Sequence, residues 1–293
     1  MLKSFAGGQV FGGTWGPAPA RVLALHGWQR THQDFSAVFD PFAAGSTSGS
    51  AAGSTTGAGP DGPGWSAVAV DLFGFGATPP PPEAWGSEEY ATHLTGLFDE
   101  PGVLADRVIL VGHSFGGRVA IPLYGLVPDR IERLVLTGVP LLHRQDRRAR
   151  PATPFRVVRR LHRMGLVGEA RMEAMRNRYG SRDYREAQGV VRGVFVRVIG
   201  EEYVDGMAAV RCPVDLVWGA EDTEVPVEVA ERAAHLFGPT AAAPGRAAPP
   251  GAPAPPAPPP APPVTLTTLP GVGHLTPTEA PDALRAVIVG DRR

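Results

Sequence analysis

The stretch that decides the fold runs from Arg107 to Gly117 and reads Arg-Val-Ile-Leu-Val-Gly-His-Ser-Phe-Gly-Gly. An apolar run of strand length, 107–111, leads directly into Gly-x-Ser-x-Gly, and a helical pattern follows through residue 126. A serine between two glycines at a strand-to-helix turn is typical of a nucleophile elbow, because small residues let strand and helix approach closely. Such a turn lifts the Ser114 hydroxyl clear of the sheet. An ordinary glycine-rich turn is the alternative interpretation.

Five further runs of strand length surround this one. They are short and mostly apolar, which is typical of parallel strands covered on both faces. We predict strands at 21–25, 67–72, 107–111, 134–137, 214–218 and 264–269. Helical patterns intervene at 87–98, 115–126, 226–237 and 277–289. This alternation predicts an α/β fold with a doubly wound, mostly parallel sheet.

Residues 141–205 interrupt the alternation, because they contain apolar residues at helical spacing and no strand pattern. We expect a helical cap here, and a core formed by 1–140 and 206–293. Residues 143–185 hold 13 arginines against four acidic residues. Arginine binds carboxylate and phosphate groups, so recognition of an anionic substrate is one interpretation, but we favour a solvated helix face. The apolar residues expected to fill the underside of the cap are Met164, Met172, Met175 and Phe195.

Two stretches have low complexity. Residues 43–64 are rich in Gly, Ala, Ser and Thr, and residues 239–263 contain 12 prolines and nine alanines. Neither composition buries enough apolar surface to offset its ordering entropy. We predict that both are loop insertions in the core, with a linker between domains as the alternative.

Polar residues follow the predicted strands where a parallel sheet binds its ligands, beyond the carboxyl ends. Asp222 lies four residues past one strand, and His274 lies five past another. The chain order Ser114, Asp222, His274 matches a nucleophile, acid and base triad in which the acid orients the histidine. Glu221 is an alternative acid. Asp146 is a poor one, because it lies among arginines in the predicted cap.

Two backbone N–H groups are candidates for binding an oxyanion. Phe115 opens the helix after the elbow, where the helix N-terminus favours negative charge. Trp28 follows His26 and Gly27 at the end of another strand, and its N–H is the second candidate, with His26 as a scaffold. Asp71, at a third strand end, is interpreted as a structural turn residue without a catalytic role.

Composition excludes several classes of protein. The formal charge of −1 provides no overall field for nucleic acid or an anionic membrane, so neither is an expected partner. Lys3 is the only lysine, which excludes P-loop and Schiff-base lysines. Cys212 is alone, which excludes an intrachain disulfide and a cysteine zinc cluster. Glycines 57, 59 and 62 match a dinucleotide-binding spacing, but no strand precedes them.

The sequence also lacks targeting signals. Residues 1–16 have no long apolar run, so we predict no signal peptide, and no window is apolar enough to span a membrane. We therefore expect a soluble cytoplasmic protein. No pattern in the sequence indicates an oligomeric state.

Taken together, these motifs resemble the α/β-hydrolase superfamily over nearly the whole chain apart from the two low-complexity stretches. The likeness is greatest to cap-bearing bacterial esterases, thioesterases, carbon–carbon hydrolases and cofactor-free haloperoxidases. It implies an eight-stranded, mostly parallel sheet, a helical cap, the Ser114–Asp222–His274 triad and no cofactor or metal. Serine at position 114 differs from the aspartate of the similar epoxide hydrolases and haloalkane dehalogenases. Pro122 also departs from the pattern, and we expect it to kink its helix.

The expected function is that of a serine hydrolase acting on a small to medium ester or thioester. Ser114 would attack the acyl carbon, while Trp28 and Phe115 hold the oxyanion and His274 transfers protons. The alternatives are a carbon–carbon hydrolase or haloperoxidase with the same triad, or a ligand-binding protein on a hydrolase scaffold.

Overall fold

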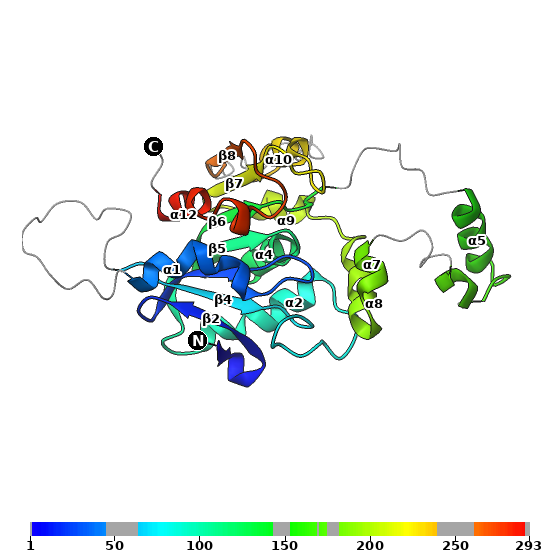
Figure 1. The fold of residues 1–293 in the computed structure, drawn as a ribbon, viewed down its shortest axis with the longest axis horizontal. Coiled ribbons are helices and arrows are strands. Elements are labelled where there is room, and N and C mark those ends of the chain that lie inside the picture. Colours follow the sequence, from blue (N-terminus) through cyan, green and yellow to red (C-terminus); the bar gives the residue numbers. More distant parts are fainter. Residues whose placement is uncertain are drawn as a thin grey trace, which may run out of the picture. The chain divides into compact units, whose positions relative to one another are not determined.

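The computed structural model describes residues 2–44, 64–142, 153–168, 170–174, 182–238 and 261–290 (Figure 1). The chain divides into two compact units. The first comprises residues 1–79, 87–142 and 202–293, and the second comprises 80–86 and 143–201. Most of both low-complexity stretches, 45–63 and 239–260, lies outside the described residues, so their assignment as loop insertions stays a prediction.

The first unit is built on an eight-stranded sheet with the order β1-β2-β4-β3-β5-β6-β7-β8. β1 and β2 are antiparallel to their neighbours, and the others are parallel. The strands are β1 (Leu2–Phe5), β2 (Val10–Trp15), β3 (Ala20–Leu25), β4 (Ala67–Asp71), β5 (Leu104–His113), β6 (Ile131–Thr137), β7 (Val214–Gly219) and β8 (Val264–Leu269). All six strands that the apolar runs predict are present. The sheet also has the eight strands implied by the resemblance to the α/β-hydrolase superfamily.

The apolar runs did not reveal β1 and β2, and there is a physical reason. β2 carries Gly12 and Gly13 at its centre, which removes the apolar pattern. Gly12 is needed there, because a Cβ would come within 2.8 Å of the Val70 Cα on the adjacent strand. The backbone of β2 therefore lies too close to β4 for a side chain.

Helices cover the sheet of the first unit. They are α1 (Ser36–Ala44), α2 (Ser87–Leu94), α3 (Gly96–Asp99), α4 (Phe115–Leu126), α9 (Val204–Ala209), α10 (Val227–Ala234), α11 (Thr276–Glu279) and α12 (Pro281–Val289), with 3-10 turns η1 (Ala6–Gly8), η2 (His32–Phe35) and η3 (Pro128–Arg130). The helices predicted at 87–98 and 277–289 are each split into two. α4 continues through Pro122 without interruption.

The two faces of the sheet are covered by different helices. Val111 of β5 belongs to a buried cluster that includes aromatic residues of α1 and Leu284 of α12. The next residue, Gly112, meets α4 instead, because a Cβ there would lie 2.6 Å from the Gly117 Cα. Successive residues of a strand point to opposite faces, so α1 and α12 cover one face and α4 the other. This arrangement is the doubly wound fold that the sequence predicts.

Between residues 153 and 198, the described part of the second unit forms helices with turns between them, whereas residues 80–86 form no helix or strand. It contains α5 (Thr153–Arg163), a helical segment at 170–174, α7 (Arg182–Glu186) and α8 (Gly189–Val198). Glu173 accepts a hydrogen bond from the Tyr184 hydroxyl at 2.6 Å and forms an ion pair with Arg192. The helical content agrees with the prediction for 141–205, whereas the placement of this segment as a cap stays a prediction.

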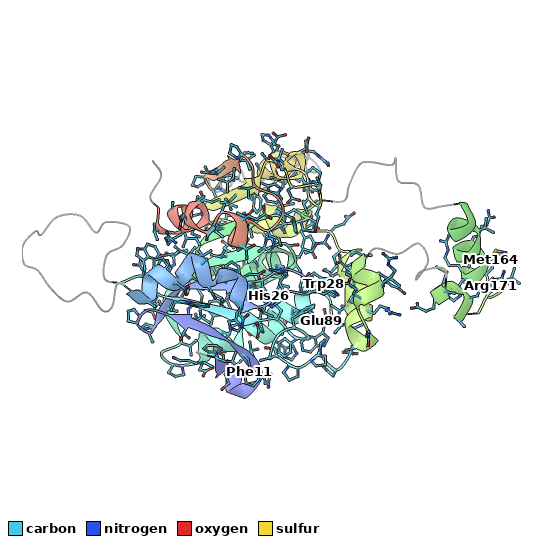
Figure 2. The ribbon with its side chains drawn as sticks, in the orientation of Figure 1. Phe11, His26, Trp28, Glu89, Met164 and Arg171 are labelled. Atoms are coloured by element: carbon cyan, nitrogen blue, oxygen red, sulfur yellow. The ribbon has the colours of Figure 1, made fainter. Side chains whose placement is uncertain are left out.

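Two of the residues expected on the underside of the cap differ in exposure, and their packing against the core stays a prediction. Met172 is 2% exposed. Met164 is 61% exposed (Figure 2). It comes after the last residue of α5, where Gly165 turns the chain at φ +73°. Met175 lies outside the described residues.

A buried ion pair ties β6, β7 and α12 together. Arg133 Nε donates to Asp215 Oδ2 at 2.6 Å, and the same guanidinium donates to the Val287 and Ile288 carbonyls at 2.9 and 3.2 Å. The Asp215 side chain is 2% exposed. These bonds satisfy the last carbonyls of α12, a helix that ends on Gly290 in the left-handed region.

We predict that Arg133→Met lowers the free energy of unfolding by about 3 kcal/mol, because it leaves a buried carboxylate without its ion-pair partner. The double variant Arg133→Met/Asp215→Leu should recover much of this loss, because it removes the stranded charge as well. Arg107→Met, at an exposed position on β5, is the matched control. Urea denaturation midpoints measure all three, and equal losses in the single and double variants would contradict the argument.

Candidate active site

The turn between β5 and α4 holds Ser114 in an unusual backbone conformation. Ser114 has φ +49° and ψ −112°, and its N–H donates to the Thr137 carbonyl of β6 at 2.9 Å. Glycine is needed on both sides, because a Cβ on Gly112 would meet α4 and one on Gly116 would meet the Leu25 carbonyl of β3. The sequence pattern therefore forms the tight strand-to-helix turn that it predicts, locked between two neighbouring strands.

Hydrogen bonds connect the side chain of Ser114 to His274, and His274 to Asp222. His274 Nε2 is 3.1 Å from Ser114 Oγ, and its Nδ1 is 2.8 Å from Asp222 Oδ2. The other oxygen, Asp222 Oδ1, accepts the N–H groups of Glu224 and Val225 at 2.9 and 2.8 Å. An aspartate held in this way acts as the acceptor for Nδ1–H, so the Nε2 lone pair faces the serine hydroxyl.

The alternative acids do not occupy this position. Asp222 is buried, whereas the neighbouring Glu221 is exposed and its N–H is bonded to the Val272 carbonyl. Asp146 lies outside the described residues. The carboxylate that reaches His274 is therefore that of Asp222.

The charges around His274 favour its protonated form. Burial alone would lower the pKa of His274, but the hydrogen bond and charge of Asp222, with smaller contributions from Glu224 and Glu279, raise it above the usual 6.5. Glu224 Oε2 lies 3.6 Å from Nε2 and is largely solvent-exposed. A base with a raised pKa accepts a proton from a nucleophile more readily.

Glu279 is a supporting residue that the sequence analysis did not find. Its carboxylate accepts the N–H groups of Gly273 at 2.6 Å and Leu275 at 3.1 Å, the two residues that flank His274. It thereby holds the short loop between β8 and α11 that carries the histidine. The feature of the sequence that could have indicated this role is a glutamate in the first turn of a helix that begins with Thr-Pro.

His113, inside the elbow, is a second residue whose setting was not foreseen. Its ring lies 5.1 Å from that of His274, and its Nδ1 donates to the Thr137 carbonyl at 3.1 Å. Burial, with the nearby His274, lowers the pKa of His113 to about 3. A neutral ring here adds no charge that would oppose protonation of His274.

The loop after β3 brings Trp28 beside the elbow. A Cβ on Gly27 would lie 3.3 Å from Ser114 Cβ, and the Trp28 and Phe115 rings are 5.3 Å apart. His26 fixes this loop, because its Nδ1 donates to the Gly27 carbonyl at 2.7 Å and its Nε2 accepts the Leu72 N–H at 2.9 Å. In a planar trans peptide, the fixed Gly27 carbonyl directs the Trp28 N–H to the opposite side.

The buried environment keeps His26 neutral, since burial lowers its pKa to about 4. The predicted scaffold role of His26 therefore agrees with its bonds. Both predicted oxyanion donors, Trp28 and Phe115, lie on segments adjacent to Ser114. Their binding of an oxyanion stays a prediction.

Asp71 holds a turn at the end of β4, as predicted. Its Oδ1 accepts the N–H of His32 at 2.7 Å and its Oδ2 accepts that of Ala77 at 2.9 Å. Within the described parts of the chain, no group of three or more His, Cys, Asp or Glu side chains could hold a metal ion. No helix in those same parts is long and apolar enough to cross a membrane.

Comparisons with known proteins give one family. A model of the alpha/beta hydrolase family matches residues 22–287. Epoxide hydrolase 2 from Siraitia grosvenorii is 40% identical over 83 residues, which is 28% of this chain and 26% of that protein. The 2-hydroxy-6-oxo-2,4-heptadienoate hydrolase of Pseudomonas putida is 42% identical over 72 residues, 24% of this chain and 25% of that protein. The matched stretches thus span about a quarter of these curated relatives.

Likeness to solved structures extends over the whole length. The structure of a thermophilic esterase from Thermogutta terrifontis has a TM-score of 0.60 and 19% sequence identity, and the match covers 98% of this chain and 96% of that one. At a sequence identity of 19%, this similarity shows a shared fold only.

We predict that Asp222→Asn lowers kcat by about 10⁴-fold, because an amide at this position favours the wrong His274 tautomer. Glu221→Gln, which changes the adjacent exposed acid in the same way, should retain nearly full activity. Steady-state kinetics on any accepted substrate measure both variants. A larger loss in Glu221→Gln than in Asp222→Asn would transfer the role to Glu221.

Proposed function

The chain belongs to the alpha/beta hydrolase family, and we propose that it is a serine hydrolase that cleaves a small to medium ester or thioester through an acyl-enzyme intermediate. The observation that carries this proposal is the continuous hydrogen-bonded path from Ser114 Oγ through His274 to Asp222. A serine is a weak nucleophile at its own pKa and needs such an adjacent base.

The proposed reaction has two halves. Ser114 Oγ attacks the acyl carbon as its proton passes to His274 Nε2, and the N–H groups of Trp28 and Phe115 hold the resulting oxyanion. His274 then protonates the departing alcohol or thiol. A water activated by the same histidine attacks the acyl-serine ester, which releases the acid and restores Ser114.

The nucleophile itself argues against epoxide opening, although an epoxide hydrolase is among the relatives. Attack of a serine oxygen on an epoxide carbon would form an ether, which has no carbonyl for water to attack. A carboxylate nucleophile would instead form an ester that water can cleave. Ser114 therefore suits substrates that already contain a carbonyl.

Carbon–carbon bond hydrolysis is the second candidate, and the Pseudomonas putida relative favours it. The same serine would attack a ketone carbonyl, and the leaving group would be a carbanion stabilised by a second carbonyl and protonated on carbon. Product analysis separates the candidates, because esters release an alcohol whereas a diketone releases a shorter ketone and an acid.

The deciding experiment is a panel of nitrophenyl esters of graded acyl length, with matched thioesters, peptide amides and a vinylogous diketone alongside. We expect turnover of esters and thioesters with an optimum in acyl length. Turnover of the diketone alone would replace the proposal with the second candidate.

We predict that Ser114→Ala reduces turnover to below about 1% of the wild-type value, because the triad acts as a unit. The wild-type chain should be labelled covalently by a fluorophosphonate, and the variant should not. The fold should be unchanged by circular dichroism. A wild-type chain that resists labelling would support a ligand-binding protein without catalysis.

We also predict that kcat/KM falls on the acid side with a midpoint above pH 6.5, because His274 must be neutral to accept the serine proton and its pKa is raised. Glu224→Gln should move this midpoint downward, because it removes a charge that favours protonation. His26 and His113, with pKa values of about 4 and 3, add no further limb above pH 5. A midpoint unchanged in Glu224→Gln would contradict this account of the field around Nε2.

A further inference from the structure

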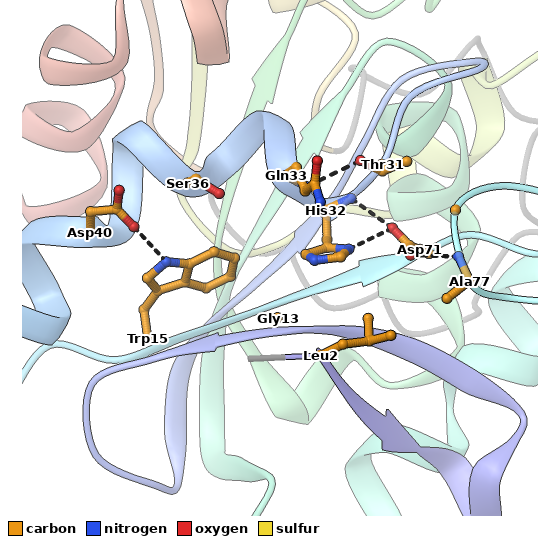
Figure 3. A pocket seen from close by; sticks show the side chains of 11 residues that line it. Leu2, Gly13, Trp15, Thr31, His32, Gln33, Ser36, Asp40, Asp71 and Ala77 are labelled. Carbon is orange, nitrogen blue, oxygen red and sulfur yellow. Dashed lines mark hydrogen bonds and ion pairs between the residues drawn. The ribbon is translucent and has the colours of Figure 1, made fainter.

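A cavity of about 790 Å³ lies in the first unit, between β1, β2, η2, α1 and the turn after β4 (Figure 3). None of the proposed catalytic residues lines it. We propose that this cavity binds a small organic cation, a quaternary or protonated amine. Volumes of 300–1,000 Å³ are usual for small-molecule sites.

A histidine in this cavity has a fixed tautomer. His32 Nδ1 lies 2.8 Å from Asp71 Oδ1, and the backbone N–H of His32 donates to the same oxygen at 2.7 Å. Burial alone would raise the pKa of Asp71, but its bonds to His32 and Ala77 lower it below the usual value. Asp71 Oδ1 accepts the proton on His32 Nδ1, so the neutral form of the ring has its lone pair on Nε2, where it can accept an N–H group of a protonated amine.

An aromatic ring and a carboxylate form the adjacent wall. Trp15 Nε1 donates to Asp40 Oδ1 at 2.9 Å, which links β2 to α1 (Figure 3). The indole also packs against the ring of Phe39, with ring centroids 5.6 Å apart, and this contact restricts the position of the indole. Indole is the aromatic group that binds cations best, and a carboxylate beside it attracts the cation as well.

The charges of the lining exclude anions and favour cations. Among the described residues, Asp40 and Asp71 line the cavity, and no lysine or arginine does. Lys3, next to the lining residue Leu2, lines a different cavity. Arg30 is engaged by Asp34 through two bonds of 2.7 Å. A bound cation would therefore meet the accessible carboxylate of Asp40, whereas the Asp71 side chain is 1% exposed and acts through His32.

A metal ion is a poorer occupant than an organic cation. The described residues offer no set of three or more His, Cys, Asp or Glu ligands. Asp71 is already committed to three hydrogen bonds, from the His32 ring and from the N–H groups of His32 and Ala77. What the lining offers is an aromatic surface and one accessible carboxylate, which suit a cation with carbon around its charge.

The test compares cations with neutral molecules of the same shape by isothermal titration calorimetry of the full chain. Choline is paired with 3,3-dimethylbutan-1-ol, and benzyltrimethylammonium is paired with neopentylbenzene. We expect each cation to bind at least about tenfold more tightly than its isostere, with weaker binding at high salt. Equal affinity within the pairs, or no binding of either cation up to about 10 mM, would overturn the proposal.

Variants place the binding in this cavity. Asp40→Asn should weaken cation binding at least about fivefold, and Trp15→Leu should weaken it further because the ring is lost. Asp106→Asn, an exposed acid on β5, is the matched control and should bind like the wild-type chain. All three should hydrolyse esters at the wild-type rate, since none contacts Ser114. Unchanged affinity in Asp40→Asn and in Trp15→Leu would show that the cation binds elsewhere and would overturn the assignment.

Discussion

The backbone of Ser114 is the constraint on which the rest of the site depends. A non-glycine residue at φ +49° is strained by about 1–3 kcal/mol, and it persists only where the surroundings leave no other conformation. Here the surroundings are the two strands beside β5. The Leu25 carbonyl of β3 approaches Gly116, and the Thr137 carbonyl of β6 accepts the Ser114 N–H. The parallel register of β3, β5 and β6 therefore fixes the position of the Ser114 hydroxyl group.

The same register explains why residues far apart in the sequence meet at this hydroxyl. β3, β5, β6, β7 and β8 run parallel, so their carboxyl ends lie along one edge. Asp222 follows β7 and His274 follows β8, and those strands are adjacent. Three histidines gather at this edge, but burial keeps His26 and His113 neutral, whereas the carboxylate of Asp222 favours the charged form of His274. These surroundings favour protonation of the ring that faces the serine and disfavour protonation of the other two.

The parallel part of this fold could be predicted from the sequence, because buried parallel strands consist of continuous runs of apolar residues. The sequence-based prediction missed β1 and β2, which lie at an antiparallel edge. The sequence of β1, Leu-Lys-Ser-Phe, has no apolar run, and β2 contains Gly12 where contact with the backbone of β4 requires a glycine. The prediction also missed α1, although Phe35, Val38, Phe39 and Phe42 repeat at helical spacing. That helix begins a few residues before a low-complexity stretch, and Pro41 obscures its pattern.

For the candidate site, sequence order and strand ends were enough to select Ser114, Asp222 and His274, but not their supports. Glu279 acts on the N–H groups beside His274, and this depends on the path of a loop rather than on spacing. The choice between Asp222 and Glu221 likewise rests on which side chain turns inward. Adjacent residues of a loop have no fixed periodicity, so only the three-dimensional structure distinguishes them.

In the described parts of the chain, a buried aspartate holds Nδ1 of two histidines, His274 with Asp222 and His32 with Asp71. The pairs share a tautomer, since each carboxylate fixes the proton on Nδ1 and leaves Nε2 as the reactive nitrogen. They differ in what Nε2 meets. At His274 it lies 3.1 Å from the hydroxyl of Ser114, where we propose that it acts as a base. The His32 ring instead lines a cavity with Trp15 and Asp40, where we propose that an organic cation binds. The pairing of histidine with aspartate therefore sets the direction of the lone pair, and the element that faces it sets the chemistry.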